Sequence, residues 1–371
     1  MLKRIKIILQ LLLLQLSART QSIPFEQLPF TNPLLTEFDS ILHEQARTFF
    51  KKSKAPGLMI GISRDGEKTF YSYGYADSAS KKIFGPGTVF EIGSITKTFT
   101  ANLLLQLDAK KIITIDNPLS VYIPGTGIND TVLSKARLKQ VANHTSGLPR
   151  LPEGMDKVEG YTMMQPYAYY KKEDLYTFLL RMKNLKPGNY SYSNLGFGLL
   201  ATIMENETNS SFESLLEKYI WKPLGMENSY INAGKARADT ATGYFYGKPA
   251  SYWVFDCMAG AGAIKSNAID LLKYLDAHIN PDKTQLGEAI KKVTEPLHTI
   301  SANMQIGYGW HTLENLKHRI TWHNGGTYGF STFAAFETLT RNSIVLAANS
   351  SGVNAALDKL AIDLCILLMG K

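Results

Sequence analysis

The sequence predicts an α+β fold in which an antiparallel sheet is flanked by helices and a second region is mostly helical. Strand patterns occur toward both ends of the 371-residue chain, whereas helical patterns fill its middle. This arrangement favours one sheet built from the two terminal segments, with the helices as an insertion between them. We therefore expect a single unit over residues 35–371, with the sheet region at about 35–93 and 253–371 and the helical region at about 94–252.

The N-terminal segment has the features of an export signal. Lys3, Arg4 and Lys6 precede an almost wholly apolar run at residues 7–16. That run is shorter than the ~20 residues that a membrane-spanning helix needs. We expect residues 1–20 to be a signal peptide and the mature protein to be periplasmic or secreted, with no membrane span after cleavage. An uncleaved leader that anchors the chain is the alternative.

The mature chain begins with a helix followed by a hairpin. Apolar residues from Leu35 to Phe49 recur at the spacing of one helix face, which predicts an amphipathic helix over residues 35–52. Apolar runs at 57–62 and 69–75 follow, and Arg64-Asp65-Gly66 between them is a hairpin turn signal.

Helical patterns dominate the middle of the chain, and strands return in its last third. Loops rich in proline and glycine separate the helical segments, which is typical of helix boundaries. The expected helices are 94–111, 137–142, 172–185, 195–206 and 211–219. The expected strands are 307–313, 319–323, 329–336 and 343–348, and a closing helix is expected over about 353–368.

Composition excludes several classes of function. The net charge of +8 includes four cations of the leader, and the rest is spread along the chain, so we expect no nucleic-acid partner. No phosphate-binding loop or zinc spacing occurs, so neither a metal nor a cofactor is expected. Cys257 and Cys365 either pair or remain buried thiols, and the sequence leaves this open, as it does the oligomeric state.

The stretch from Phe90 to Thr100 contains the strongest chemical signal. Ser94 and Lys97 are three residues apart and so share one face of the predicted helix. A serine hydroxyl needs a base to become a nucleophile, and a buried lysine can act as one because burial lowers its pKa. The helix N-terminus favours an oxyanion there. A second S-x-x-K, Ser78 to Lys81, lies in a polar turn and is expected to be a loop.

Two further motifs supply partners for Ser94. Tyr192-Ser193-Asn194 precedes a predicted helix; a nearby lysine would favour the Tyr192 phenolate, which would serve as base and then acid. We expect Asn194 to contact a substrate amide and Lys97. Tyr230-Ile231-Asn232 has the same pattern, and a merely packed tyrosine is the alternative. His323-Asn324-Gly325-Gly326 ends a predicted edge strand, and the Gly326 N–H could join that of Ser94 as an oxyanion hole.

Together and in this order, the three motifs resemble the serine β-lactamase and penicillin-binding-protein superfamily, in the branch of class C β-lactamases with related DD-peptidases and class VIII esterases. The resemblance extends from about Leu35 to the C-terminus and includes segments 143–149, 223–226, 259–262 and 269–272. It implies that Ser94 is the nucleophile, Lys97 its activator and Tyr192 the general base and acid. It implies substrate contacts by Asn194, His323, Asn324, Gly325 and Gly326.

The chain departs from the family pattern where K-T-G reads His323-Asn324-Gly325. Histidine carries only partial charge near neutral pH, so we expect carboxylate-bearing substrates to bind better below the pKa of His323. We predict a serine hydrolase that acts through an acyl-enzyme on a small-molecule or peptide substrate, a β-lactam or a D-amino-acid peptide. A class VIII-type carboxylesterase and a penicillin-reactive sensor that deacylates slowly are the alternatives; an inactive scaffold would be expected to have lost one of the three motifs.

Overall fold

The computed structural model describes residues 24–32, 34–126, 130–232, 234, 239–284, 286–314 and 318–369. The expected signal peptide, residues 1–20, lies outside these ranges. Within them, no helix combines the length and the apolar character that crossing a membrane requires.

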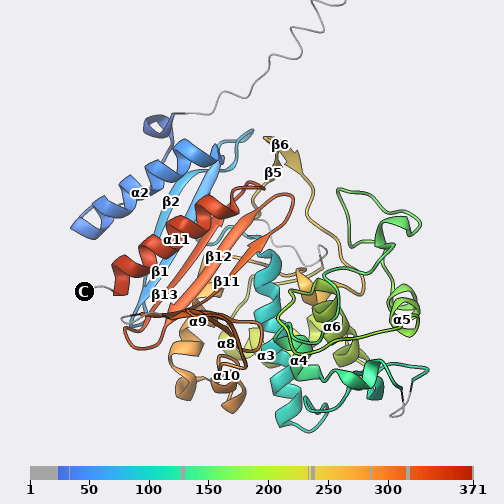
Figure 1. The fold of residues 1–371 in the computed structure, drawn as a ribbon. Helices are drawn as coiled ribbons and strands as arrows, with labels where there is room; N and C mark the ends of the chain where they lie inside the picture. Colours follow the sequence, from blue (N-terminus) through green and yellow to red (C-terminus); the bar gives the residue numbers. More distant parts are fainter. Residues whose placement is uncertain are drawn as a thin grey trace, which may run out of the picture.

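A nine-stranded antiparallel sheet forms the centre of the fold (Figure 1). β1 pairs along its length with β13, from Leu58 opposite Ala348 to Arg64 opposite Asn342, which confirms that the two terminal segments share one sheet. Across the sheet the strands are β3 (Lys82–Ile83), β2 (Glu67–Asp77), β1 (Gly57–Arg64), β13 (Asn342–Ala348), β12 (Ser331–Glu337), β11 (Arg319–Gly326), β10 (His311–Glu314), β9 (Met304–Ile306) and β8 (His298–Ser301).

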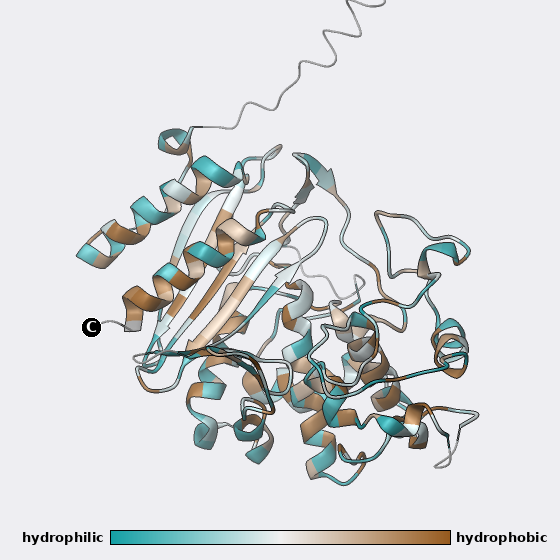
Figure 2. Ribbon diagram, viewed as in Figure 1, coloured by the Kyte–Doolittle hydropathy of each residue, from teal (hydrophilic) through white to brown (hydrophobic). Residues whose placement is uncertain are grey.

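Helices cover both faces of this sheet, so the predicted α+β architecture is confirmed. α2 (Glu37–Ser53) and α11 (Asn354–Met369) lie on one face (Figure 1). Side chains of a strand alternate between faces: Leu58 and Ile60 of β1 pack with α2 and α11, whereas Met59 enters the core shared with the helical region. Figure 2 shows the resulting apolar central strands beside the polar outer surface of α2.

The first helix begins two residues later than predicted because Thr36 caps it. The Thr36 hydroxyl accepts from the Asp39 N–H at 3.1 Å, and the Asp39 carboxylate accepts from the Thr36 N–H at 2.9 Å. This reciprocal capping box satisfies two N–H groups that the helix itself leaves without a partner. Leu35 therefore lies outside the helix and is 82% exposed, whereas Phe38 and Phe49 of the predicted stripe are buried.

The helical region lies beside the sheet. Its helices are α3 (Thr96–Ala109), α4 (Leu138–Ala142), α5 (Lys172–Leu180), α6 (Asn194–Thr208), α7 (Phe212–Leu216) and α8 (Lys222–Leu224). Two more helices, α9 (Ala268–Ile279) and α10 (Glu288–Lys292), come later in the chain. A π-helical turn, Glu217–Trp221, joins α7 to α8. Short 3-10 turns are Phe25–Gln27, η2 (Gly93–Ile95), Leu119–Val121, Leu133–Lys135, Met155–Lys157, η8 (Ala259–Ala261) and Pro281–Lys283. The division into a sheet region, about 35–93 and 253–371, and a helical region, about 94–252, remains a prediction.

Several elements differ from the sequence expectation. α5 ends at Leu180 rather than residue 185, and the helix expected over 211–219 is split between α7 and the π-helical turn. β10 begins at His311 because Gly309 adopts a left-handed conformation (φ +74°) that interrupts the strand expected from residue 307. α9 was not predicted as a helix; Asn267 caps it by accepting from the Asp270 N–H at 2.8 Å.

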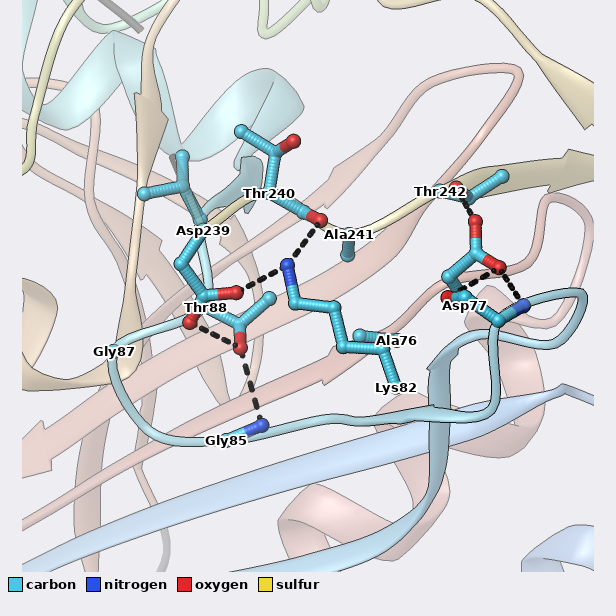
Figure 3. Close-up of polar contacts among 12 residues, drawn as sticks. Ala76, Asp77, Lys82, Gly85, Gly87, Thr88, Asp239, Thr240, Ala241 and Thr242 are labelled. Carbon is cyan, nitrogen blue, oxygen red and sulfur yellow. Dashed lines mark hydrogen bonds and ion pairs between the residues drawn. The ribbon is translucent and has the colours of Figure 1, made fainter. Parts of the chain in front are cut away.

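Two small sheets connect the helical region to the main sheet. β4 (Phe90–Glu91) pairs with β7 (Lys265–Ser266), and β5 (Gly243–Phe245) pairs with β6 (Lys248–Ala250). Polar contacts hold the segment before β5 against the chain that leads into β4 (Figure 3). Lys82 forms an ion pair with Asp239, and Thr88 donates to the same carboxylate at 3.0 Å. Thr242 donates to Asp77 at 2.5 Å, which fixes the far end of the segment.

Candidate active site

Ser94 lies where the sheet and the helical region meet. It sits in η2, immediately after β4 and before α3. Gly93 makes this junction possible, because its φ of +51° suits glycine and a Cβ there would lie 2.7 Å from the Gly326 nitrogen. The backbone that carries Ser94 is therefore packed directly against the end of β11, which brings the two predicted oxyanion-hole residues together.

Lys97 is fully buried beneath Ser94. Its Nζ lies 3.0 Å from Ser94 Oγ and donates to the Ala261 carbonyl at 2.6 Å. Burial lowers the pKa of Lys97 well below its usual value, and the nearby positive charge of Arg150 lowers it further. A neutral amine at this distance can accept the hydroxyl proton of Ser94.

The segment that accepts from Lys97 is locked onto α3. Thr96 accepts from the Ile264 N–H at 3.2 Å, and Thr100 donates to the Gly260 carbonyl at 2.7 Å. A Cβ on Gly260 would lie 2.3 Å from the Phe197 carbonyl of α6, so only glycine lets η8 fit between the two helices. The small residues of the 259–262 motif thus fix the position of Lys97 Nζ.

The loop after α4 holds Tyr192 in place. The His144 carbonyl accepts from the Ser191 N–H at 2.8 Å, and His144 Nδ1 accepts from the Ser193 N–H at 3.0 Å. The His144 ring also packs against Tyr192, with centroids 4.4 Å apart. Lys97 Nζ lies 4.9 Å from the Tyr192 ring centroid. The structure therefore brings Ser94, Lys97 and Tyr192 together as the three motifs suggested.

The protonation expected for Tyr192 is reversed. Burial raises the pKa of Tyr192, and a hydrogen bond with the Ser94 side chain offsets this only in part. Nearby positive charge was expected to favour the phenolate, but desolvation is the larger effect here. In the free protein Tyr192 is a phenol, which is ready to give a proton rather than to take one.

Asn194 begins α6 and lines the same cavity as Ser94. Its amide nitrogen donates to the Tyr167 hydroxyl at 3.1 Å, so the predicted contact with Lys97 is replaced by one with Tyr167. Its side-chain oxygen is buried and has no hydrogen-bond partner among the described residues. An unpartnered buried acceptor is costly, and a substrate N–H would satisfy it.

His323 is buried behind the cavity rather than exposed in it. Its Nδ1 lies 2.6 Å from the Asn324 carbonyl, and its ring centroid is 6.3 Å from that of Tyr192. Burial lowers the pKa of His323 well below its usual value, and the neighbouring His311 and Lys97 add to this effect. His323 is therefore neutral near neutral pH, and the predicted gain in carboxylate binding on its protonation has no support in this geometry.

The neighbours of His323 on β11 have structural contacts. Because side chains alternate along a strand, Asn324 points to the opposite face, where it donates to Asp358 of α11 at 2.7 Å. A Cβ on Gly325 would lie 2.0 Å from the Ile92 carbonyl, so this glycine permits the contact between β11 and the chain before Ser94. Of the predicted substrate contacts, Asn194 and Gly326 line the cavity.

β11 is an interior strand, not the edge strand expected, because β10 and β12 pair with its two sides. β10 pairs only with residues 319–322, however, whereas β12 pairs with residues 321–326. The backbone from His323 to Gly326 thus lacks a strand partner on the side of β10. The end of β11 retains the open backbone that the prediction required.

The cavity above Ser94 has a volume of about 110 Å³. Pockets for drug-sized ligands measure roughly 300–1,000 Å³, so this cavity accommodates only the reacting end of a substrate. Sequence reasoning missed four of its lining side chains, Arg150, Tyr167, Trp253 and Phe255. Arg150 directly follows the 143–149 motif and the two ring residues of 253–255 precede the 259–262 motif, so proximity to motifs was the available signal.

A buried carboxylate supports the aromatic wall of the cavity. Glu91 accepts from the Trp253 N–H at 2.5 Å and from the Thr327 hydroxyl at 2.7 Å. Burial raises the pKa of Glu91, and the positive charge of Lys265 opposes that shift. Because Glu91 lies in β4, three residues before Ser94, these hydrogen bonds connect the segment that carries Ser94 to the cavity wall formed by Trp253.

The second copies of the two short motifs lie elsewhere. Ser78 to Lys81 form the turn between β2 and β3, as predicted, where the Ser80 N–H donates to Asp77 at 2.7 Å. Tyr230 is buried and pairs through its backbone with Lys265, which indicates a packing role. Neither copy lines the cavity that contains Ser94.

The two cysteines lie in different parts of the core. Cys257 and Cys365 are free buried thiols that belong to the cores on opposite faces of the sheet, so they do not form a disulfide. In the part of the chain that the structure describes, no three His, Cys, Asp or Glu side chains are grouped to hold a metal ion.

Comparisons with known proteins agree on one family. The family model described as Beta-lactamase matches residues 42–364. A β-lactamase of Providencia stuartii is 29% identical over 266 residues, which cover 71% of this chain and 64% of that protein. The D-alanyl-D-alanine-carboxypeptidase/endopeptidase AmpH of Escherichia coli is 25% identical over 90% of this chain and 91% of its own. A β-lactamase/D-alanine carboxypeptidase structure from Pseudomonas syringae superposes with a TM-score of 0.77 at 23% identity, covering 89% of this chain and 99% of its own.

Proposed function

The chain belongs to the β-lactamase family, and we propose that it hydrolyses a β-lactam or a D-amino-acid peptide bond through an acyl-enzyme on Ser94. The family, the fold and the serine hydrolase class are as predicted. The observation that carries the proposal is the 3.0 Å contact between Ser94 Oγ and Nζ of Lys97, a buried amine whose pKa is lowered well below its usual value by burial. The relatives reported above are named for lactam or peptide hydrolysis, which favours these substrates over an ester or a permanent adduct.

In acylation, Lys97 takes the hydroxyl proton while Ser94 Oγ bonds to the substrate carbonyl carbon. The carbonyl oxygen becomes an oxyanion, which the N–H groups of Ser94 and Gly326 would stabilise from the floor of the cavity. The C–N bond then breaks, and the phenol of Tyr192 gives its proton to the departing nitrogen. The ammonium of Lys97 can return its proton to the Tyr192 phenolate, whose ring lies 4.9 Å away, so the net proton balance closes.

Deacylation uses the same groups. A water molecule gives a proton to the Lys97 amine and attacks the ester carbonyl carbon; the C–O bond to Ser94 then breaks, and Ser94 Oγ leaves with the proton that Lys97 returns. The oxyanion groups act a second time. Asn194 would accept a hydrogen bond from a substrate N–H through its unpartnered oxygen, which orients the acyl chain.

The test follows hydrolysis of a chromogenic cephalosporin and release of D-alanine from a peptide ending in D-Ala-D-Ala. We expect Ser94→Ala to lose turnover of whichever substrate is accepted, whereas Ser78→Ala, in the second S-x-x-K, serves as the matched control and keeps it. Intact-mass measurement after exposure to penicillin should show one adduct that Ser94→Ala lacks. Turnover that survives Ser94→Ala would overturn the proposal.

We also propose that the protein is exported. The described residues contain no helix able to span a membrane, and residues 1–20 have the charge and apolar pattern of a signal peptide. Expression of the full chain with its leader should give a periplasmic or extracellular species whose mass lacks about the first 20 residues. A protein of full-length mass in the cell membrane fraction would contradict cleavage.

A further inference from the structure

The catalytic cavity contains one charged side chain, Arg150. Among the described residues that line it, Arg150 is the cation and none is a carboxylate. Arg150 is exposed to solvent where it lines the cavity, whereas the amine of Lys97 is buried beneath Ser94 and contacts Ser94 Oγ and the Ala261 carbonyl. Arg150 therefore brings a positive charge to this small cavity, and no lining side chain brings a negative one.

The Arg150 guanidinium has no partner of its own. Among the described residues, no hydrogen bond or ion pair engages its side chain, although a guanidinium offers five N–H donors. The groups whose titration its charge influences are Lys97, three tyrosines near the site and His144, and none of these is a carboxylate. A guanidinium without a hydrogen-bond or ion-pair partner, at the wall of a cavity that no carboxylate lines, is suited to an anionic ligand.

The backbone of Arg150 is nevertheless hydrogen-bonded to the segment that carries Asn194. Its carbonyl accepts from the N–H groups of Asn194 and Leu195, at 3.0 and 3.1 Å, which ties it to the start of α6. Its guanidinium carbon lies 5.0 Å from the Tyr192 ring centroid, a cation–π distance. The guanidinium thus lies beside Tyr192, the general acid, and its backbone is joined to Asn194, the residue expected to bind the acyl chain.

We propose that Arg150 binds a carboxylate of the substrate and thereby selects anionic acyl donors. This inference rests on the proposed function of Ser94. At the K-T-G position this chain has His323, which is buried, neutral and behind the cavity wall and so is not placed to bind a substrate carboxylate. Arg150 would supply the positive charge instead. Arginine suits this role because its planar fork holds a carboxylate with two parallel hydrogen bonds. The carboxylate lies either on the acyl group or on the leaving group.

Two pairs of substrates separate these positions. For the acyl side, mono-4-nitrophenyl glutarate is compared with 4-nitrophenyl pentanoate, in which a methyl group replaces the carboxylate. For the leaving side, an N-acetylated tripeptide ending in D-Ala-D-Ala is compared with the same peptide carrying a C-terminal carboxamide. In each pair the measured quantity is the ratio of kcat/KM for the charged and neutral partners, which cancels any loss that affects both.

We expect the wild-type ratio to favour the charged substrate in one pair, and Arg150→Gln to lower that ratio by about 10- to 100-fold, as for loss of a hydrogen bond between charged groups. Arg150→Lys should retain part of the ratio, because charge survives without the bidentate fork. Arg181→Gln removes the same charge from an exposed arginine outside this cavity and should leave the ratio unchanged. A ratio that Arg150→Gln does not change in either pair overturns the inference.

A binding measurement distinguishes failure of the inference from failure of the proposed function. Phenylboronic acid and 3-carboxyphenylboronic acid add to an active serine without needing turnover. If no substrate is hydrolysed in a Ser94-dependent way, the proposed function fails, and the ratio of the two boronate dissociation constants still reports on Arg150. Tighter binding of the carboxylated boronate by the wild type than by Arg150→Gln supports the inference, and equal ratios overturn it.

Discussion

Replacing Lys97 by methionine should make the stability of the protein depend differently on pH. Lys97 is fully buried, and burial lowers its pKa well below the ordinary value of 10.5. Between the lowered pKa and about 10.5, the unfolded chain binds a proton at this lysine that the folded chain does not. The free energy of unfolding of the wild type therefore rises with pH in that window, and Lys97→Met lacks this contribution.

The slope can be given a magnitude because it depends on one proton. One proton corresponds to about 1.4 kcal/mol per pH unit. The difference in unfolding free energy, variant minus wild type, should fall by about that amount for each unit above the lowered pKa. At neutral pH two effects of the substitution oppose each other: methionine removes the cost of burying an amine, but it leaves the Ala261 carbonyl unpaired, which costs about 1–3 kcal/mol.

The assay is urea unfolding of the wild type and Lys97→Met between about pH 7 and pH 9.5 at fixed ionic strength. Other titrating groups are common to both proteins and cancel in the difference. Lys52→Met, on the exposed side of α2, is the matched control and should run parallel to the wild type. Parallel curves for Lys97→Met as well would mean that Lys97 is charged when folded, and would refute its role as a ready proton acceptor.

Three further predictions follow from the site and its supports. Tyr192→Phe should lower kcat for amide substrates by about 10²- to 10⁴-fold, since it removes the proton donor, and an unchanged kcat would exclude that role. Gly325→Ala should destabilise the fold by about 1–3 kcal/mol or more, because the new Cβ meets the Ile92 carbonyl, while Gly87→Ala, with open space around it, should stay within about 0.5 kcal/mol by thermal unfolding. Burial raises the pKa of Asp358 to about 6, so the folded chain binds more protons than the unfolded chain from about pH 4 to 6; wild-type stability relative to Asp358→Asn should fall across that window, and a flat difference would contradict the shift.

Local patterns carried the prediction of the catalytic core. Ser94 and Lys97 are one helical turn apart, so their proximity follows from geometry that a sequence reveals. Tyr192 could be joined to them only through the resemblance to a family, since 94 residues of chain lie between Lys97 and Tyr192. The α+β fold followed from the distribution of strand and helix patterns, and the short strands β3 to β9 were missed because two to four residues give little periodicity.

The misassigned contacts depend on facts that appear only in three dimensions. Asn324 turns away from the cavity because strand alternation places it opposite His323, and the face of β11 that lines the site is not evident without the sheet register. The protonation of Tyr192 and His323 was misjudged because desolvation exceeds the effect of nearby charges. Arg150 was not predicted as a site residue, because its proposed role depends on which other side chains line the cavity, and the sequence does not show this.

Substrate binding and catalysis are linked through the charge of Arg150. The charge of Arg150 lowers the pKa of Lys97, so in the free protein it helps to keep the amine neutral but also makes the amine a weaker base. A substrate carboxylate on Arg150 would cancel much of that repulsion and raise the basicity of Lys97 when the substrate is in place. The proton of Ser94 would then be taken more readily with an anionic acyl donor than with a neutral one. Substrate charge should consequently affect kcat as well as KM, because the same arginine that binds the carboxylate sets the strength of the base beneath it.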